Sequence, residues 1–456
     1  MNIDGRTRLI GLLGDPVEHT MSPMIHNTLS ELLGINDVYV PFHTRKQGLE
    51  QAVKGAYELN ILGLNATVPH KNHVIKYLCG LDDGSRAIGA VNTLVRTSEG
   101  YKGYNTDMLG LMREVKSYGI ALSGQDVIIL GAGGAAKAVA YMCMSEKAAH
   151  VYIFNRTKSK AEEIAKHMNE HFGNDIMIAG ALSDYKKLKQ KKYIVFQSTS
   201  IGLHPNDDEA VITDEDFYKL VDTGVDLVYN PFETGFMKRC RAEGAKAYNG
   251  LKMLLYQGII AYELWNHISV DEKTADIVYQ RLLKATRNNI VLTGFMGCGK
   301  STVGLAISEK YGYKLVDTDS VIEEKAGMPI SKIFQTKGEA YFRSLETKVL
   351  MELNETLSNT VISTGGGLPL REENQKLLTS LGNVVYLNVE AEEVLCRLAG
   401  DTTRPLLQGK NPRERITELM DYRKPIYEQG ADVTISVTGK SVADIVEEVM
   451  NGYSKT

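Results

Sequence analysis

The sequence predicts an α/β protein in which strands alternate with helices along two successive halves. Short aliphatic runs pass into glycine-rich turns at three places, residues 8–14, 126–134 and 289–299. Amphipathic stretches such as residues 159–172 lie between these runs and have the hydrophobic spacing of helices. Alternation of this kind is typical of parallel sheets that are covered by helices.

Length and composition limit the classes of protein that the chain can represent. At about 150 residues per domain, 456 residues correspond to roughly three domains. The content of 43% hydrophobic and 24% charged residues is ordinary for a globular protein. With 52 basic and 56 acidic residues, the chain lacks the positive field that attracts nucleic acids, so we expect no nucleic-acid partner. Five scattered cysteines, no long apolar run and no export signal predict a cytoplasmic protein that does not enter a membrane.

The first glycine-rich turn with a specific pattern follows the predicted strand DVIIL at residues 126–130. Gly131, Gly133 and Ala136 form the pattern GxGxxA, in which the glycines allow close approach to a pyrophosphate and the alanine lets a helix pack on the strand. This pattern predicts a Rossmann domain, although a glycine turn without a ligand is the alternative. The predicted nucleotide-binding backbone comprises Gly131, Gly133, Gly134 and Ala135.

The next predicted strand, VYIF, ends in Asn155, Arg156 and Thr157, where an NAD enzyme usually has an acidic residue. A carboxylate accepts hydrogen bonds from ribose hydroxyls, whereas a guanidinium donates two hydrogen bonds to a 2′-phosphate. These three residues therefore predict NADP as the cofactor. A solvated surface position for Arg156 is the alternative.

A second phosphate-binding pattern opens the other half of the chain. GFMGCGKS at residues 294–301 matches GxxxxGK[ST] and lies between a predicted strand and a predicted helix. Backbone N–H groups of such a loop cradle phosphates, Lys300 reaches the β/γ oxygens, and the Ser301 hydroxyl binds Mg²⁺. The segment predicts ATP and Mg²⁺, and no NKxD base-reading segment favours a GTPase. The predicted nucleotide-binding residues are Gly294, Gly297, Cys298, Gly299, Lys300, Ser301 and Thr302.

Six polar motifs occur in order in the first half: HTMSP, GLNATVPHK, GAVNT, NTDMLG, NRTKSKA and NGLKMLLYQ. This series resembles shikimate dehydrogenase over about residues 8–283. The resemblance implies that Lys71 and Asp107 form a catalytic pair in which the lysine assists proton transfer while NADPH delivers hydride to a ketone. It also implies substrate contacts, for which turns or helix caps are the alternative roles: Thr20 and Ser22 for the carboxylate, Asn65, Thr67, Asn92 and Gln257 for hydroxyls, and Tyr229 to close the site.

The first half also departs from the family pattern. Thr20 stands where the family usually has serine, Ala66 replaces the usual valine, and residues 197–203 match only loosely. The additional methyl group of Thr20 leaves the preference for shikimate over quinate open.

Five further motifs follow in the second half: DTD, FRSLE, TGGG, TTRPLL and YRKPIYEQGA. This series resembles shikimate kinase over nearly all of residues 289–456. The resemblance implies that Asp317 supports Mg²⁺ and that Asp319 holds the acceptor hydroxyl. Its further implied roles are a carboxylate site at Arg343, Arg423 and Gly366, ring contacts at Phe334 and Phe342, adenine packing at Arg397, and phosphoryl stabilisation at Arg404 in a lid flanked by Gly400 and Gly409. Core packing of the two phenylalanines and a solvated Arg397 are the alternatives.

The two resemblances together imply a bifunctional enzyme of aromatic biosynthesis that reduces 3-dehydroshikimate with NADPH and phosphorylates shikimate with ATP. We expect small-molecule substrates as its partners and leave the oligomeric state open. Residues 284–289 are expected to be a short polar linker that limits reorientation of the halves. The alternatives are a quinate/shikimate dehydrogenase fused to another small-molecule kinase, and a half that only binds ligand. The expected domains are a substrate domain at 1–107 completed by 250–285, a Rossmann domain at 108–249 and a P-loop kinase domain at 286–456.

Overall fold

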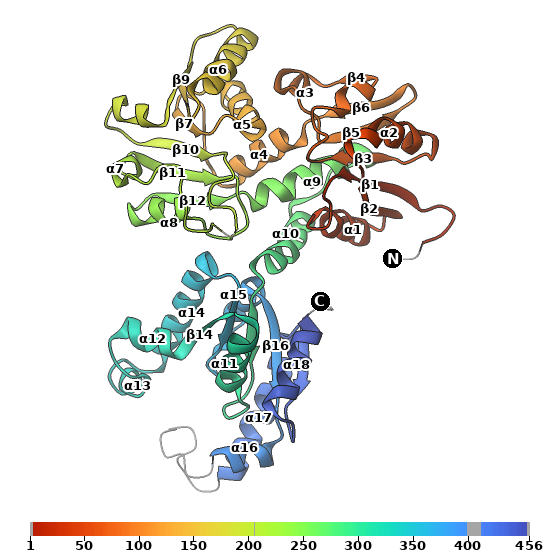
Figure 1. The fold of residues 1–456 in the computed structure, drawn as a ribbon. Helices are drawn as coiled ribbons and strands as arrows, with labels where there is room; N and C mark the ends of the chain where they lie inside the picture. Colours follow the sequence, from red (N-terminus) through yellow and green to blue (C-terminus); the bar gives the residue numbers. More distant parts are fainter. Residues whose placement is uncertain (1–2, 205, 399–411, 454–456) are drawn as a thin grey trace. The chain divides into compact units, whose positions relative to one another are not determined.

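The computed structural model describes residues 3–204, 206–398 and 412–453. The chain divides into two compact units, Met1–Leu282 and Leu283–Thr456 (Figure 1). Both units are built from strands and helices in alternation, so the predicted α/β fold is confirmed. None of the helices within the described ranges is long and apolar enough to cross a membrane.

The first unit contains two sheets, and the N-terminal one is mixed. Its strand order is β2-β1-β3-β5-β6-β4. β1 pairs in parallel with β2 and β3, whereas β5 runs antiparallel to β3 and β6. The connection between β5 and β6 has only two residues, which is enough to join antiparallel strands but not parallel ones. The strands are β1 (Arg8–Gly14), β2 (Asp37–His43), β3 (Gly63–Ala66), β4 (Gly80–Leu81), β5 (Thr93–Thr97) and β6 (Gly100–Tyr104).

The second sheet of this unit is entirely parallel, in the order β12-β11-β10-β7-β8-β9. The chain begins the sheet at β7, in its middle, and then builds outward in both directions. Ligands of such sheets bind at the carboxyl ends of the strands, beside the strand where the order reverses. The strands are β7 (Asp126–Leu130), β8 (His150–Asn155), β9 (Met177–Ala181), β10 (Tyr193–Gln197), β11 (Val221–Asp226) and β12 (Lys246–Asn249).

Two close helix contacts of the first unit fix the position of α9, which carries the predicted site residue Gln257. Gly110 in α4 lies so close to α9 that a Cβ atom there would be 2.6 Å from the backbone nitrogen of Gln257. Trp265, near the end of α9, packs on Gly63 and donates a hydrogen bond from Nε1 to Leu94 O at 2.9 Å. The helices are α1 (Ser22–Leu33), α2 (Leu49–Glu58), α3 (Asp83–Ile88), α4 (Thr106–Ser117), α5 (Gly134–Ser145), α6 (Lys158–Phe172), α7 (Glu215–Tyr218), α8 (Gly235–Ala242) and α9 (Leu251–Asn266).

The segment predicted as a polar linker is mostly helix. α10 (Glu272–Arg287) continues through it to Arg287, and β13 starts at Ile290. Arg287 is buried and donates hydrogen bonds to Asn354 Oδ1 at 2.7 Å and to Ser380 O at 2.6 Å. The polar residues of this segment are therefore packing and pairing groups, which their charge alone does not reveal.

The second unit is a five-stranded parallel sheet in the order β14-β15-β13-β16-β17. Its middle strand, β13, leads directly into the GFMGCGKS loop, as the sequence predicted. The carboxyl ends of β14, β15 and β13 are neighbours, so the segments that follow them meet at one edge of the sheet. The elements are β13 (Ile290–Thr293), α11 (Lys300–Tyr311), β14 (Lys314–Asp317), α12 (Thr318–Ala326), α13 (Ile330–Lys337), α14 (Glu339–Thr356), β15 (Thr360–Ser363), α15 (Glu372–Leu381), β16 (Asn383–Asn388), α16 (Ala391–Leu398), α17 (Pro412–Gln429), β17 (Val433–Ser436) and α18 (Val442–Tyr453).

Candidate functional site

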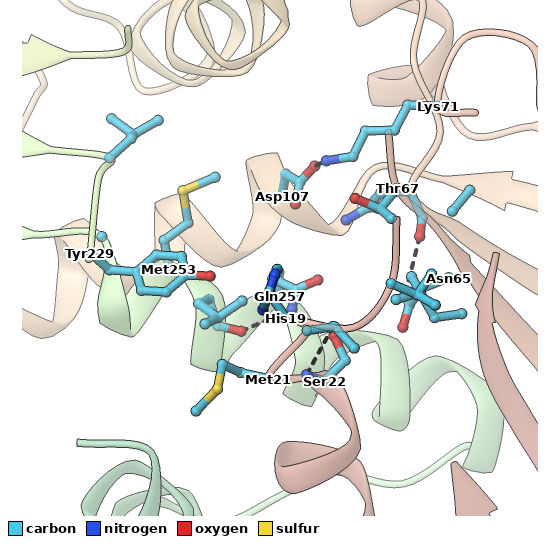
Figure 2. Close-up of a pocket in the computed structure, with 18 of the residues that line it drawn as sticks. His19, Met21, Ser22, Asn65, Thr67, Lys71, Asp107, Tyr229, Met253 and Gln257 are labelled. Carbon is cyan, nitrogen blue, oxygen red and sulfur yellow. Dashed lines mark hydrogen bonds and ion pairs between the residues drawn. The ribbon is translucent and has the colours of Figure 1, made fainter. Parts of the chain in front are cut away.

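One cavity of about 350 Å³ in the first unit collects all nine residues of the first half that the sequence analysis assigned to substrate or catalysis. They come from segments spread over more than two hundred positions of the sequence. Figure 2 shows Lys71 and Asp107 pointing toward each other, with Tyr229 on the opposite side of the cavity from Asn65. The nine residues are Thr20, Ser22, Asn65, Thr67, Lys71, Asn92, Asp107, Tyr229 and Gln257.

Lys71 and Asp107 form an ion pair at this cavity. Lys71 Nζ donates to Asp107 Oδ2 at 2.7 Å, and the two side chains are 34% and 22% exposed. The neighbouring His70 is buried and its Nε2 lies 2.6 Å from Thr44 O, so that nitrogen donates and holds the segment in place. Asp107 lies in the first turn of α4, whose N-cap residue Asn105 accepts a hydrogen bond from Met108 N. A charged pair on a half-open cavity has the geometry to move a proton to or from a bound carbinol.

Asn65 and Asn92 use their amide groups in different ways. Asn65 Nδ2 donates to Asn92 O and Thr93 Oγ1 at 3.1 and 3.0 Å, while its Oδ1 accepts from Tyr39 OH at 2.8 Å. Both N–H donors of Asn65 are thus occupied, and its free capacity is a lone pair on Oδ1. Asn92 has the reverse arrangement, since Oδ1 accepts from Thr106 N at 2.7 Å and Nδ2 forms no hydrogen bond with the described residues. A ligand hydroxyl can therefore donate to Asn65 and accept from Asn92.

Thr20 and Ser22 lie at the N-terminus of α1. Ser22 N donates to Thr20 Oγ1 at 3.2 Å, and no side chain caps the helix at Met21. Uncapped N–H groups and the positive end of the helix dipole favour an anion at this place. The local structure therefore suits the carboxylate that the resemblance assigned to these hydroxyls.

The cavity is also lined by residues to which the sequence analysis gave no role. They are mainly large apolar side chains that shape the cavity, and all of those named below except Leu227 lie inside a quoted motif. Tyr39 was missed as well, and its position in β2 gave no signal, because its contact with Asn65 depends on strand pairing. The unassigned lining residues include His19, Met21, Leu227, Met253 and Leu254.

The predicted nucleotide turn lies at the carboxyl end of β7. Gly131 has φ of 115°, and a Cβ atom there would lie 2.8 Å from both Ser198 Oγ and Thr199 Cγ2, so only glycine fits. Gly133 and Gly134 face open space and are exposed, and no side chain caps the N-terminus of α5. Ala136 is completely buried. This turn fits a pyrophosphate, because it offers unpaired N–H groups with no Cβ in the way.

Asn155 is the last residue of β8, the strand beside β7 in the sheet, and Arg156 and Thr157 follow it. Asn155 Nδ2 donates to Thr157 O at 2.9 Å and fixes the bend, and Arg156 is exposed. The guanidinium makes no ion pair within the described part of the chain. Arg156 is therefore free to bind a phosphate.

In the second unit, the phosphate loop adopts the strained backbone that its glycines allow. Gly294, Gly297 and Gly299 have φ of 142°, 80° and 100°. Lys300 Nζ folds over the loop and donates to the carbonyl oxygens of Gly294 and Phe295 at 2.9 and 3.1 Å. Thr302 is exposed at the start of α11, whereas Cys298 is buried beneath the loop with Sγ 3.8 Å from Lys300 Nζ.

Ser301 and Asp317 meet although they come from different elements, Ser301 from the start of α11 and Asp317 from the end of β14. Ser301 Oγ donates to Asp317 Oδ2 at 3.1 Å and shares a hydrogen bond with Ser363 Oγ at 3.2 Å. Asp317 Oδ1 accepts from Asp319 N at 3.0 Å and so caps α12. A hydroxyl and a carboxylate beside a phosphate loop are oxygen ligands that fit Mg²⁺, which takes few protein ligands and several waters. Asp319 lies against the TGGG turn, with Oδ1 only 2.5 Å from where a Cβ of Gly365 would be.

The predicted carboxylate-binding groups surround the same turn. Arg343 packs on Gly367 and forms two hydrogen bonds from Nη1 to Glu346, at 3.0 and 2.9 Å. Burial raises the pKa of Glu346, although the Arg343 guanidinium opposes that shift. Arg423 is 6% exposed, and its Nε has no hydrogen-bond partner among the described residues. Glu346 was missed as a partner of Arg343, yet it lies in the quoted FRSLE motif, one helical turn from the arginine.

The remaining kinase assignments have different outcomes. Phe342 is 5% exposed within a cluster that includes Ile322, Ile333 and Val349, whereas Phe334 is 36% exposed with its ring centroid 4.8 Å from that of Phe342. The structure thus agrees with the core alternative for Phe342. Arg397 Nη1 donates to Gly297 O at 3.1 Å, and the guanidinium also pairs with Glu393. Arg404, Gly400 and Gly409 lie outside the described residues.

Family models match three parts of the chain. Residues 12–94 match the shikimate dehydrogenase substrate binding domain, residues 113–222 match shikimate / quinate 5-dehydrogenase, and residues 296–453 match shikimate kinase. Both resemblances found in the motifs are therefore confirmed.

Individual proteins match the first half. Shikimate dehydrogenase (NADP(+)) of Caldanaerobacter subterraneus subsp. tengcongensis is 38% identical over 282 residues, 62% of this chain and 99% of the relative. The protein of that name from Methanocaldococcus jannaschii is 37% identical over 270 residues, 58% of this chain and 94% of the relative.

Solved structures of shikimate 5-dehydrogenases are also similar to the first half. Shikimate 5-dehydrogenase of Listeria monocytogenes in complex with shikimate and NAD has a TM-score of 0.57 at 30% identity, covering 62% of this chain and 98% of that one. A chorismate mutase/shikimate 5-dehydrogenase fusion protein from Clostridium acetobutylicum has a TM-score of 0.56 at 32% identity, covering 61% of this chain and 98% of that one. The chain therefore belongs to the shikimate dehydrogenase family and carries a shikimate kinase domain in its C-terminal part.

Proposed function

We propose that the first half reduces 3-dehydroshikimate to shikimate with NADPH and that the second half phosphorylates the 3-hydroxyl of shikimate with ATP. The observation that carries this proposal is the Lys71–Asp107 pair on a cavity that also holds an uncapped helix N-terminus and oriented amides. These groups match a small ring acid with several hydroxyls. The phosphate loop and the Arg343–Gly366–Arg423 cluster of the second unit suit the next step on the same compound.

In the reduction, Lys71 donates a proton to the carbonyl oxygen as the carbon is reduced. NADPH, held at the Gly131 turn, supplies the hydride that this carbon accepts. Asp107 keeps the ammonium of Lys71 directed into the cavity and accepts from a neighbouring hydroxyl of the ring. Thr20, Ser22 and the start of α1 hold the carboxylate, so that the ring presents the correct carbon.

In the phosphorylation, Asp319 accepts the proton of the attacking hydroxyl, while Arg343, Arg423 and the Gly366 N–H hold the carboxylate. Lys300 moves from the loop carbonyls to the β/γ oxygens of ATP. Ser301 and Asp317 would hold Mg²⁺, which neutralises charge on those oxygens. Catalysis of this type consists mainly of positioning and charge stabilisation, which agrees with a site made of cations and backbone donors.

Arg156 supports NADP as the cofactor of the reduction. It is an exposed cation beside the nucleotide turn and has no carboxylate partner in the described chain. The residue that follows the second strand of an NAD enzyme is normally acidic, and an acidic residue repels a 2′-phosphate.

A coupled assay tests both steps. The purified chain is supplied with 3-dehydroshikimate, NADPH, ATP and Mg²⁺, and NADPH loss and phosphorylated product are followed together. We expect phosphorylated shikimate to appear only when NADPH and ATP are both present. Phosphorylated product formed without NADPH, or NADPH loss with no phosphorylated product, contradicts the two-step assignment.

Quinate is a second candidate substrate of the first half, because Thr20 adds a methyl group beside the predicted carboxylate site. Comparison of kcat/KM for shikimate and quinate in the oxidation direction separates the two. The proposal requires shikimate to be the better substrate.

A further inference from the structure

Tyr427 is a buried tyrosine behind the predicted carboxylate site of the second unit. It lies in α17, is 2% exposed, and its hydroxyl donates a hydrogen bond to the carbonyl oxygen of Gly366. Its ring packs against the ring of Tyr386 with a centroid separation of 5.2 Å. The phenol therefore has a fixed position.

The TGGG turn is held by hydrogen bonds on both sides of the Gly366 N–H. Gly365 N donates to Thr318 Oγ1 at 3.0 Å, and Gly365 O accepts from Leu368 N at 3.1 Å. The Tyr427 hydroxyl donates to the carbonyl oxygen of Gly366. The N–H groups of Gly366 and Gly367 form no hydrogen bond with another described residue, so the Gly366 N–H lies between tied groups and stays available to a ligand.

Tyr427 also contacts the arginine of the same site. Arg423 lies one helical turn before it in α17, with its guanidinium carbon 5.7 Å from the centre of the Phe295 ring. Burial raises the pKa of Tyr427 to about 12, and the adjacent Arg423 opposes that rise through its charge and a hydrogen bond. One phenol thus lies against both the arginine and the turn.

We propose that Tyr427 is a positioning residue that holds the Arg423 guanidinium and the Gly366 N–H in register, so that both reach the same carboxylate. The inference rests on the proposed kinase function and assigns Tyr427 no contact with the substrate. Without the phenol hydroxyl, the Gly366 carbonyl loses its partner and the turn gains freedom. The cost appears when the carboxylate binds, because the two donors then have to be ordered by the ligand.

Tyr427→Phe in the full chain tests the role, because it removes one oxygen atom and keeps the ring packing. Loss of one hydrogen bond to a site group predicts a rise of about 3- to 10-fold in the KM for shikimate. The KM for ATP and the rate of 3-dehydroshikimate reduction should stay within twofold of wild type. With the methyl ester of shikimate, which lacks the carboxylate charge, the variant and the wild type should differ by less than twofold in KM.

Tyr386→Phe is the matched control. Tyr386 is equally buried, stacks on the same ring, and donates its hydroxyl to Asn388 Oδ1 at 3.1 Å, away from the TGGG turn. It should leave the KM for shikimate unchanged. An equal rise in both variants, or a change in the KM for ATP that matches the change for shikimate, would show general loosening and overturn the positioning role.

The outcome for Tyr427 is separable from the outcome for the proposed function. If the wild-type chain binds shikimate without phosphorylating it, the proposed kinase activity fails. Calorimetric titration with shikimate then still decides about Tyr427, since a Kd that is the same in wild type and Tyr427→Phe contradicts the inference.

Discussion

The two predicted sites differ in how far their polar groups are already paired. In the first unit, the Lys71 ammonium is paired with Asp107, and both donors of the Asn65 amide are used within the protein. In the second unit, Arg423 Nε is buried without a partner in the described chain. Lys300 donates to two carbonyl oxygens of its own loop and to the Cys298 sulfur, and it has no carboxylate partner among the described residues. Arg343 is the exception in the second unit, because its Nη1 already donates to Glu346. Hydroxyls are recognised by oriented neutral groups, whereas carboxylates and phosphates are bound most strongly by charged donors.

The variant with the largest expected effect tests whether the sites of the two halves work independently. Lys71→Ala removes the proton donor of the reduction, so we expect the rate of 3-dehydroshikimate reduction to fall by about 10² to 10⁴-fold. Phosphorylation of added shikimate should be unchanged. Both rates are measured on the same preparation, and loss of both in a folded variant contradicts separate sites.

The mirror experiment is Lys300→Ala in the phosphate loop. This variant removes the cation that meets the β/γ oxygens of ATP, and we expect kcat of phosphorylation to fall by about 10² to 10³-fold. NADPH oxidation with 3-dehydroshikimate serves as the internal control and should keep its wild-type rate. Residual phosphorylation near the wild-type level would remove Lys300 from the reaction.

Arg156→Ala sharpens the comparison, because Arg156 is a cation beside the nucleotide turn of the first unit and has no ion pair with any described residue. A hydrogen bond to a charged group is worth roughly 1.5–3 kcal/mol, so kcat/KM with NADPH should fall about 10- to 100-fold. Activity with NADH should change little, since NADH has no 2′-phosphate. Equal losses of kcat/KM with NADPH and NADH would show that Arg156 does not act on the 2′-phosphate.

The smallest expected effect concerns a buried carboxyl of the first unit. Glu114 in α4 is completely buried, and neither carboxyl oxygen has a hydrogen-bond partner among the described residues. Burial raises its pKa to about 8, against the opposing influence of Met253 N–H and Lys252. Between the ordinary pKa of 4.5 and about 8, the unfolded state has released a proton that the folded state retains, so stability falls as pH rises through this window.

Glu114→Gln should remove most of that pH dependence, which has a limiting slope of about 1.4 kcal/mol per pH unit. Unfolding by urea is followed through the fluorescence of Trp265, the single tryptophan of the chain, which is buried in the first unit. The free energy of unfolding is compared at pH 5.5 and pH 8. An equal change in wild type and Glu114→Gln between these two pH values would show that Glu114 titrates normally.

The sequence predicted the strands and helices that carry the motifs with good accuracy. β1 and β7 have the predicted limits, and the GxGxxA and GFMGCGKS turns lie between strand and helix as expected. These elements are recognisable because local hydrophobic spacing and glycine positions depend on neighbours in the sequence. The segment 284–289 was misjudged for the opposite reason, since its polar residues pair with groups far away, such as Asn354.

The predicted site residues show the same division. Motif order was sufficient to select the predicted residues that line the first cavity. It gave no indication that the Tyr39 hydroxyl donates a hydrogen bond to Asn65 Oδ1. It left core packing of Phe342 open as an alternative to a ring contact, and it gave no indication that Glu346 holds Arg343 in place.

By itself, the sequence determined which chemical groups the protein has and in which order they follow one another: two nucleotide turns, a lysine–aspartate pair and a set of arginines. Only the tertiary structure decided which of these groups stay available to a ligand. Hydrogen bonds such as Tyr427 to Gly366 and Tyr39 to Asn65 join segments that are distant in sequence. A donor or acceptor is free or occupied according to what the fold brings within about 3 Å of it, and that depends on the packing of all the elements together.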